Sequence, residues 1–179
     1  MKIILKSGDA LEVAENATAM QAAMAISEGL ARNAVCAKVN GELVDLSHVL
    51  NENDNLEIVT LKDKEGLQVY RHTCAHVLAQ ALKTVYPTCK LSIGPVIENG
   101  FYYDVDFVTP ITQADLAKVE SEMQKIIKGN LPIERFTLPK EEAVALMSSY
   151  SEDYKVELIN DLPDGETISF YKQGNFTDL

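Results

Sequence analysis

The sequence predicts an α+β protein, and three observations support this fold class. Short runs rich in β-branched and aromatic residues, bounded by Gly and Asn turns, occur beside longer segments with apolar residues at helical spacing. Apolar residues make up 46% of the 179 residues and charged residues 24%, which allows a packed core and argues against disorder. A polar segment, "KDKEG" at 62–66, is expected to be a linker between a smaller first part and a larger second part.

The first part, residues 1–61, reads as a small sheet with one helix. "KIIL" and "LEV" predict a hairpin, "AVCAKVNGELV" a second hairpin about Asn40-Gly41, and "NLEIVTL" a last strand. Thr18 and Gln21 form a capping-box pattern that begins the helix. The order hairpin, helix, hairpin, strand is that of a ubiquitin-like β-grasp. The apolar face expected for the helix consists of Met20, Ala23, Met24 and Leu30.

A long helix is expected from about Gly66 to Tyr86, where Pro87 stops it. Its predicted apolar stripe leaves His72 and His76 on the opposite side, four residues apart and therefore on one face. The stripe consists of Leu67, Tyr70, Cys74, Leu78, Ala81, Leu82 and Val85.

The rest of the second part mixes strands and helices. "KLSIGPVIENGFYYDVDF" predicts two strands separated by Gly94-Pro95, with a second turn at Asn99-Gly100. A helix capped by Thr112 and Asp115 then runs to Gly129. "LPIERFTL" predicts a strand, "PKEEAVALM" a helix and "ETISFYKQGNFTDL" further strands, while "YKVELIND" fits either. The side chains expected to face inward from the capped helix are Leu116, Val119, Met123, Ile126 and Ile127.

Composition narrows the possible functions. No apolar run is long enough for a membrane span, and the N-terminus lacks the pattern of a signal peptide. Three cysteines without regular spacing favour reduced thiols, so we expect a cytoplasmic protein. The formal net charge of -11 argues against a free-standing nucleic-acid binder, and any RNA contacts would have to be completed elsewhere.

The histidine pair has more than one reading. His72 and His76 could simply be polar residues on the solvent-exposed side of a helix. They could also bind a metal, or serve as a general base beside a hydrogen-bond donor. The pair lacks the Glu of a His-Glu-x-x-His zinc motif, and two ligands do not complete a zinc site. The remaining histidine, His48, lies in the first part.

A group of aromatic residues follows the Gly-rich turns. Because neighbouring strand residues face opposite sides, one of Tyr102 and Tyr103 is expected to point outward. Such a ring either lies on the solvent-exposed face of a hairpin or forms a surface on which a nucleobase or ribose stacks.

The two motifs "RHTCAHVLAQALK" and "KLSIGPVIENGFYYDVD" together resemble the editing domain of bacterial threonyl-tRNA synthetases, here at residues 67–179. The first part resembles the TGS domain that these enzymes share with certain GTPases and stringent-response synthetases. The resemblance implies hydrolysis of seryl-tRNA(Thr) made in error, at the acceptor end of the tRNA. A missing methyl group gives only about 1–3 kcal/mol of discrimination, so a second, hydrolytic sieve is the physical remedy.

The resemblance also implies a site. His72 and His76 match residues that position water or move protons, Lys155 in "SEDYKVELI" matches a lysine facing the substrate, and Asp178 in "NFTDL" matches an acidic residue. Without the resemblance, Lys155 and Asp178 read as ordinary surface charges. The substrate-binding residues expected from the turn and aromatic segment are Gly94, Pro95, Tyr102 and Tyr103.

The family pattern continues with a Cys-x-x-x-His motif, whereas this sequence stops at Leu179. We therefore expect an editing domain truncated at its C-terminal end, nearly inert alone, with no tightly bound metal. The resemblance places the ATP, Mg and Zn sites of the full-length enzyme in its catalytic domain, and its homodimer interface also outside this sequence. The alternatives are the N-terminal regulatory region of a nucleoside kinase and a non-catalytic TGS binding module.

Overall fold

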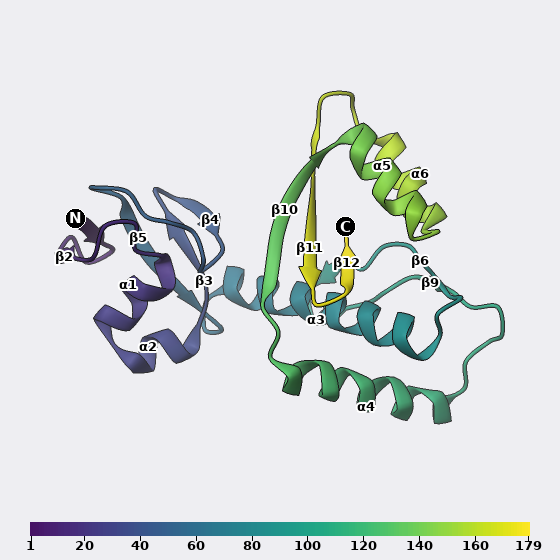
Figure 1. The fold of residues 1–179 in the computed structure, drawn as a ribbon. Coiled ribbons are helices and arrows are strands. Elements are labelled where there is room, and N and C mark those ends of the chain that lie inside the picture. The colour runs from purple at the N-terminus through teal and green to yellow at the C-terminus, as the bar shows by residue number, and fades with distance from the viewer. The chain divides into compact units, whose positions relative to one another are not determined.

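The computed structural model describes all 179 residues, which form two compact units, Met1–Arg71 and His72–Leu179 (Figure 1). Each unit combines helices with a sheet around its own apolar core, so the predicted α+β class is confirmed. The longest helix, α3 (Lys64–Val85), contributes residues to both units. No helix has both the length and the apolar character needed to cross a membrane.

The first unit contains a five-stranded sheet in the order β2-β1-β5-β3-β4. Strands β1 and β5 are parallel and the other neighbours antiparallel, as in the predicted β-grasp. The second hairpin turns at Asn40 and Gly41, whose φ angles of 52° and 90° fit a type I′ turn. The five strands are β1 (Lys2–Leu5), β2 (Ala10–Glu12), β3 (Ala34–Val39), β4 (Glu42–Val44) and β5 (Asn55–Thr60).

The helical segment of this unit is broken in two, which the sequence did not predict. Thr18 and Gln21 form the predicted capping box of α1 (Ala19–Ile26). Ser27 then adopts an extended conformation, and its side chain caps α2 (Glu28–Asn33). The predicted apolar face is wrong in part, because Met24 is 58% exposed. The residues of α1 that are buried are the small ones, Ala19, Ala22 and Ala23.

The segment predicted as a linker, 62–66, is mostly the first turn of α3. The Asp63 carboxylate accepts hydrogen bonds from the backbone N–H and the hydroxyl of Thr60, and the Asp63 carbonyl accepts from Leu67 N. A turn closed in this way leads directly into a helix, so the charges of "KDKEG" mark a helix start. Separate domains at 1–61 and 67–179 stay a prediction.

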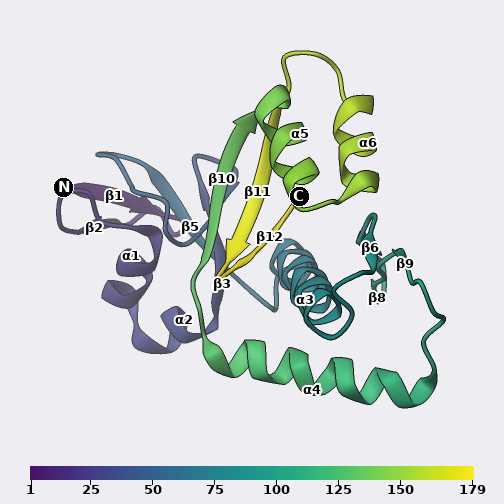
Figure 2. The same ribbon diagram turned by 45° about the vertical axis from the view of Figure 1, so that its right-hand side comes forward.

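The second unit is built around α3, a long helix and a three-stranded antiparallel sheet in the order β10-β11-β12. Helices α5 and α6 lie side by side against this sheet, as both views show (Figures 1 and 2). The ambiguous segment "YKVELIND" is helical. The elements are α4 (Gln113–Gly129), β10 (Ile133–Pro139), α5 (Lys140–Ser149), α6 (Asp153–Asp161), β11 (Thr167–Gln173) and β12 (Phe176–Asp178).

The segment between α3 and α4 forms short strands that pair around nested turns, where the sequence predicted two longer strands. The inner pair turns at Glu98-Asn99, and the outer pair lies on either side of it. These strands are β6 (Lys90–Leu91), β7 (Val96–Ile97), β8 (Gly100–Phe101) and β9 (Val105–Asp106).

Two predicted burial patterns need correction. Helix α3 is not apolar on one side only, because Ala75, Val77, Ala79 and Ala81 are all buried along its middle. The second unit encloses this part of the helix from more than one direction, so an amphipathic reading of α3 fails. On α4, Val119, Met123 and Ile126 face the core as predicted, whereas Leu116 and Ile127 are exposed.

Candidate functional site

Five residues predicted for the site lie together in the second unit. His72 and His76 come from α3, Tyr103 from the segment after β8, Lys155 from α6 and Asp178 from β12. Asp178 is at the centre of the group and is 2% exposed, and Lys155 is 3% exposed. Four separate elements thus supply one polar cluster, which we call the histidine cluster.

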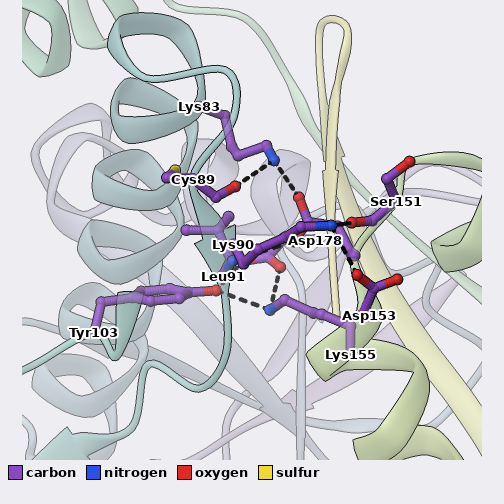
Figure 3. A network of polar contacts seen from close by, with 10 residues as sticks. Lys83, Cys89, Lys90, Leu91, Tyr103, Ser151, Asp153, Lys155 and Asp178 are labelled. Atoms are coloured by element: carbon purple, nitrogen blue, oxygen red, sulfur yellow. Dashed lines mark hydrogen bonds and ion pairs between the residues drawn. The ribbon is translucent and has the colours of Figure 1, made fainter. Parts of the chain in front are cut away.

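The Asp178 carboxylate is fully engaged. One oxygen, Oδ2, accepts from His76 Nδ1 at 2.8 Å and from the Tyr103 hydroxyl at 2.9 Å. The other, Oδ1, lies 2.5 Å from Lys155 Nζ and accepts from Leu179 N at 3.0 Å. Lys155 also donates to the Tyr103 oxygen at 2.8 Å, so these three side chains form a closed triangle (Figure 3).

When both imidazoles are neutral, the hydrogen bonds determine their tautomers. Asp178 can only accept, so His76 Nδ1 must carry a proton and His76 Nε2 is left as an acceptor. His72 Nε2 lies 3.1 Å from His76 Nε2 and must be the donor in that contact. The lone pair of the outer ring is therefore on Nδ1 of His72, which stands at the exposed end of an Asp–His–His chain.

The charge of Asp178 is held by its partners. Burial is the largest influence and acts to raise the pKa of this carboxyl. The hydrogen bond from His76 and the charge of Lys155 outweigh it, so that the pKa lies well below its usual range. Asp178 is an anion at neutral pH, able to orient His76 through Nδ1.

Burial also sets the other two titrations in the cluster. It raises the pKa of Tyr103 far above its usual value, and the negative charge of Asp178 adds to this, so the phenol stays protonated. For His72, burial is the largest influence and lowers the pKa below its ordinary value, and a proton on His76 would lower it further. A neutral His72 at pH 7 is a proton acceptor in its working form.

The other predicted substrate-binding residues are placed differently. A Cβ on Gly94 would come within 2.5 Å of two carbons of the Tyr103 ring, so Gly94 lies directly against that ring. The Pro95 carbonyl accepts from Tyr102 N at 3.4 Å. Tyr102 is 45% exposed, as expected for the outward member of the tyrosine pair.

A further aromatic ring beside the histidines was not predicted from the sequence. Tyr171 on β11 lies with its ring centroid 5.6 Å from that of His76 and 6.5 Å from that of His72. Its neighbour Phe170 is in the core on the opposite face of the strand. Alternation in "TISFYKQ" would have separated these two faces, but nothing in the sequence indicated that one of them meets the histidines.

A cavity of about 230 Å³ adjoins the cluster. Lys155 and Asp178 belong both to the histidine cluster and to the wall of this cavity. Two of the three N–H donors of Lys155 are used by Asp178 and Tyr103, and the remaining one can serve a group bound in the cavity. The other lining residues are Lys83, Leu91, Met147, Tyr150, Glu152, Asn175, Phe176 and Thr177.

The cluster is poorly suited to a metal ion. The two histidine Nε2 atoms are joined by a hydrogen bond, and the nearest carboxylate already has partners on both oxygens. No group of three or more His, Cys, Asp or Glu side chains in the described residues is placed to hold one. That no metal binds tightly stays a prediction, and stoichiometric zinc in the dialysed protein would contradict it.

Comparison with known proteins accounts for both parts of the chain. A family model described as the TGS domain matches residues 1–60. All 179 residues align with the threonine–tRNA ligases of Clostridioides difficile and Acetivibrio thermocellus at 55% identity, and with that of Clostridium tetani at 52%. The chain spans 28% of the length of each of these relatives. These matches place the chain in the threonine–tRNA ligase family, as the counterpart of the N-terminal region of its members.

Proposed function

We propose that the second unit hydrolyses the ester of seryl-tRNA(Thr), as an editing activity within a threonine–tRNA ligase. The observation that carries this proposal is the chain Asp178–His76–His72, which leaves an unprotonated ring nitrogen at its outer end. Hydrolysis of an ester needs a base for the attacking water, and a neutral histidine of lowered pKa supplies one.

The proposed mechanism assigns each residue a separate task. His72 accepts the proton of the attacking water through Nδ1 and returns it to the ribose oxygen that leaves when the ester C–O bond breaks. His76 fixes the ring of His72 by accepting its Nε2 proton. Asp178 holds His76 in the required tautomer. Lys155 supplies positive charge beside the cavity, where it stabilises an oxyanion or orients the aminoacyl group.

The partner in this proposal is the acceptor end of tRNA(Thr) carrying serine. A net charge of -11 opposes the approach of a polyanion, so this chain needs the remainder of a ligase to hold the tRNA. ATP and the metal ions of aminoacylation belong in this proposal to that remainder, as the family resemblance implies.

The test uses a full-length chimaera in which these 179 residues replace the matching region of the Clostridioides difficile ligase, 55% identical to them. Release of labelled serine from seryl-tRNA(Thr) is followed with enzyme in excess, beside threonyl-tRNA(Thr). We expect hydrolysis of the seryl ester only. His72→Ala should reduce its rate about 100-fold or more, within the range of general acid–base catalysis.

The matched control is His48→Ala, which removes the exposed histidine of the first unit. It should leave the rate unchanged. The isolated chain is assayed in parallel and should be nearly inert, as the sequence analysis predicts. A chimaera that leaves seryl-tRNA(Thr) intact would reject the proposed function, and equal rates with and without His72 would reject the proposed base.

A further inference from the structure

A second buried ion pair lies beside the histidine cluster and takes no part in the proposed mechanism. Lys83 Nζ, from α3, is 2.5 Å from Glu152 Oε1, and the two side chains are 22% and 8% exposed. Lys83 also donates to the Cys89 carbonyl at 2.9 Å, and Glu152 Oε2 accepts from Leu91 N at 3.2 Å. Figure 3 shows Lys83 directed toward the same region as Asp178 and Lys155.

Glu152 and Lys155 are linked through the backbone. The Glu152 carbonyl accepts from Lys155 N and from Val156 N, both at 3.1 Å, so Glu152 is the residue from which α6 begins. Residues three apart on a helix are neighbours on its surface, and a Glu and a Lys at this spacing readily pair. Glu152 is therefore a natural competitor for the ammonium group of Lys155.

The turn before α6 is held in place by Lys90. Ser151 has a φ of 58°, a conformation that a residue with a side chain rarely adopts unless its surroundings impose it. Lys90 donates to the Ser151 carbonyl at 2.5 Å and pairs with Asp153 at 2.8 Å (Figure 3). Backbone freedom near Glu152 is thus small, and Glu152 lines the same cavity as Lys83 and Lys155.

Two lysines and two carboxylates line one cavity and could pair in two ways, but the structure contains only one of these arrangements. Lys83 pairs with Glu152 and Lys155 pairs with Asp178. Ion pairs in poorly solvated sites contribute more to the choice of one arrangement than to net stability, because desolvation offsets the attraction. The Lys83–Glu152 pair removes the alternative in which Lys155 turns back to Glu152.

We propose that Lys83 is a positioning residue, which occupies the Glu152 carboxylate so that Lys155 stays bound to Asp178 and Tyr103. The proposal rests on the proposed function in that it assigns Lys155 to the hydrolytic site. Its chemical consequence is specific. Without Lys83, Lys155 is drawn to Glu152, the Tyr103 oxygen loses its donor and Asp178 loses its cation.

The experiment compares Lys83→Met with the double variant Lys83→Met/Glu152→Gln in the chimaera. Misplacement of a catalytic group by about 1 Å can cost on the order of 100-fold in rate. We expect Lys83→Met to lower kcat at least tenfold with little change in KM. The double variant, which lacks the competing charge, should recover most of that loss. Lys125→Met, which removes an exposed lysine paired at i,i+3 on α4, is the matched control and should keep the parent kcat.

Two results would overturn the proposal: a kcat within twofold of the parent in Lys83→Met, or a double variant no faster than the single one. If Lys83→Met does not fold, Lys83→Gln replaces it with the same expectations, because its amide can still donate to the Cys89 carbonyl. A crystal structure of the variant chain tests the proposal without any activity. It should show Lys155 paired with Glu152, and an intact Lys155–Asp178 pair would contradict it. Absence of hydrolysis in the parent chimaera would instead reject the proposed function.

Discussion

Gly94 shows how a residue without a side chain can determine the position of one that has a functional role. An added Cβ would lie 2.5 Å from Cδ2 and Cε2 of Tyr103, far inside van der Waals contact. The ring would have to move, and its hydroxyl would leave Asp178 and Lys155. We therefore expect Gly94→Ala to lower kcat for seryl-tRNA hydrolysis by the chimaera at least tenfold, by the same sensitivity to misplacement.

Gly100 provides the matched control in the same segment. A Cβ at Gly100 has no neighbour within 4 Å and its φ is not in the left-handed region, so alanine fits there without strain. Gly100→Ala should keep kcat within twofold of the parent. Equal losses in both variants would mean that the segment, and not the position of the Tyr103 ring, sets the rate.

The role of His72 as a base determines the direction in which the proposed reaction depends on pH. The ordinary pKa of histidine is about 6.5, and burial lowers it here. A base acts in its neutral form, so activity rises with pH through this lowered pKa and is complete above it. We expect kcat/KM to rise with pH to a plateau, with its midpoint below the ordinary histidine pKa value of about 6.5.

The measurement is kcat/KM of the chimaera between pH 5 and 8, corrected for spontaneous hydrolysis of the ester. His48→Ala should give the same profile, since His48 belongs to the other unit. Activity that increases toward acid would contradict the assignment, because it would require His72 to act as a proton donor.

At the scale of elements, the sequence was most informative where one signal decides the structure. The capping boxes at Thr18 and Thr112 and the Asn40-Gly41 turn predicted helix starts and a hairpin that the structure contains. Burial was less predictable. The side of α3 that was expected to face solvent is partly buried. On α4, Ile127 was expected to face inward but is 62% exposed. Periodicity shows which residues share a face, but not which other element covers it.

The site was predictable only in part for the same reason. Helical spacing alone places His72 and His76 together, as α3 does. The approach of Asp178, 102 residues further along the chain, depends on how β12 pairs in the sheet, and no local pattern encodes that. Lys155 and Asp178 came from family resemblance, and Lys83, Glu152 and Tyr171 were missed because each acquires its partners only in the folded unit.

The start of α3 gives a prediction about an element junction. A Cβ on Gly66 would lie 2.0 Å from the Thr60 carbonyl oxygen. This oxygen is a backbone atom and cannot move aside as a flexible side chain would. Gly66→Ala should therefore destabilise the first unit by about 1–3 kcal/mol, the usual cost of overpacking, even though alanine favours helices. Urea unfolding followed by circular dichroism measures the change.

Gly129→Ala is the matched control for this junction. Gly129 also lies in a helix, α4, but a Cβ there meets nothing within 4 Å. The substitution should be neutral or stabilising by up to about 1 kcal/mol, because alanine has the higher helix propensity. If Gly66→Ala were stabilising to the same degree, the close approach of α3 to β5 would not exist in solution.

At the scale of the whole molecule, the question is where the first unit ends. The sequence predicts that residues 1–61 fold alone, and the structure adds groups beyond them to the same unit. Asp63 satisfies the N–H and hydroxyl of Thr60 at the end of β5, and Glu65 pairs with Lys38 at 2.8 Å. Chain 1–61 lacks both partners, so the end of its last strand is left to solvent.

We therefore expect a fragment of residues 1–71 to give dispersed amide NMR signals and to melt several degrees above fragment 1–61. The lost contacts are a few hydrogen bonds of about 1 kcal/mol each, and 1 kcal/mol shifts the Tm of a domain of this size by about 4–8 °C. Asp63→Ala in the longer fragment isolates the cap and should remove part of the difference, whereas Asp9→Ala, in the exposed turn between β1 and β2, should not. Equal melting temperatures for the two fragments would place the end of the folding unit at β5, and α3 would then depend on the second unit alone.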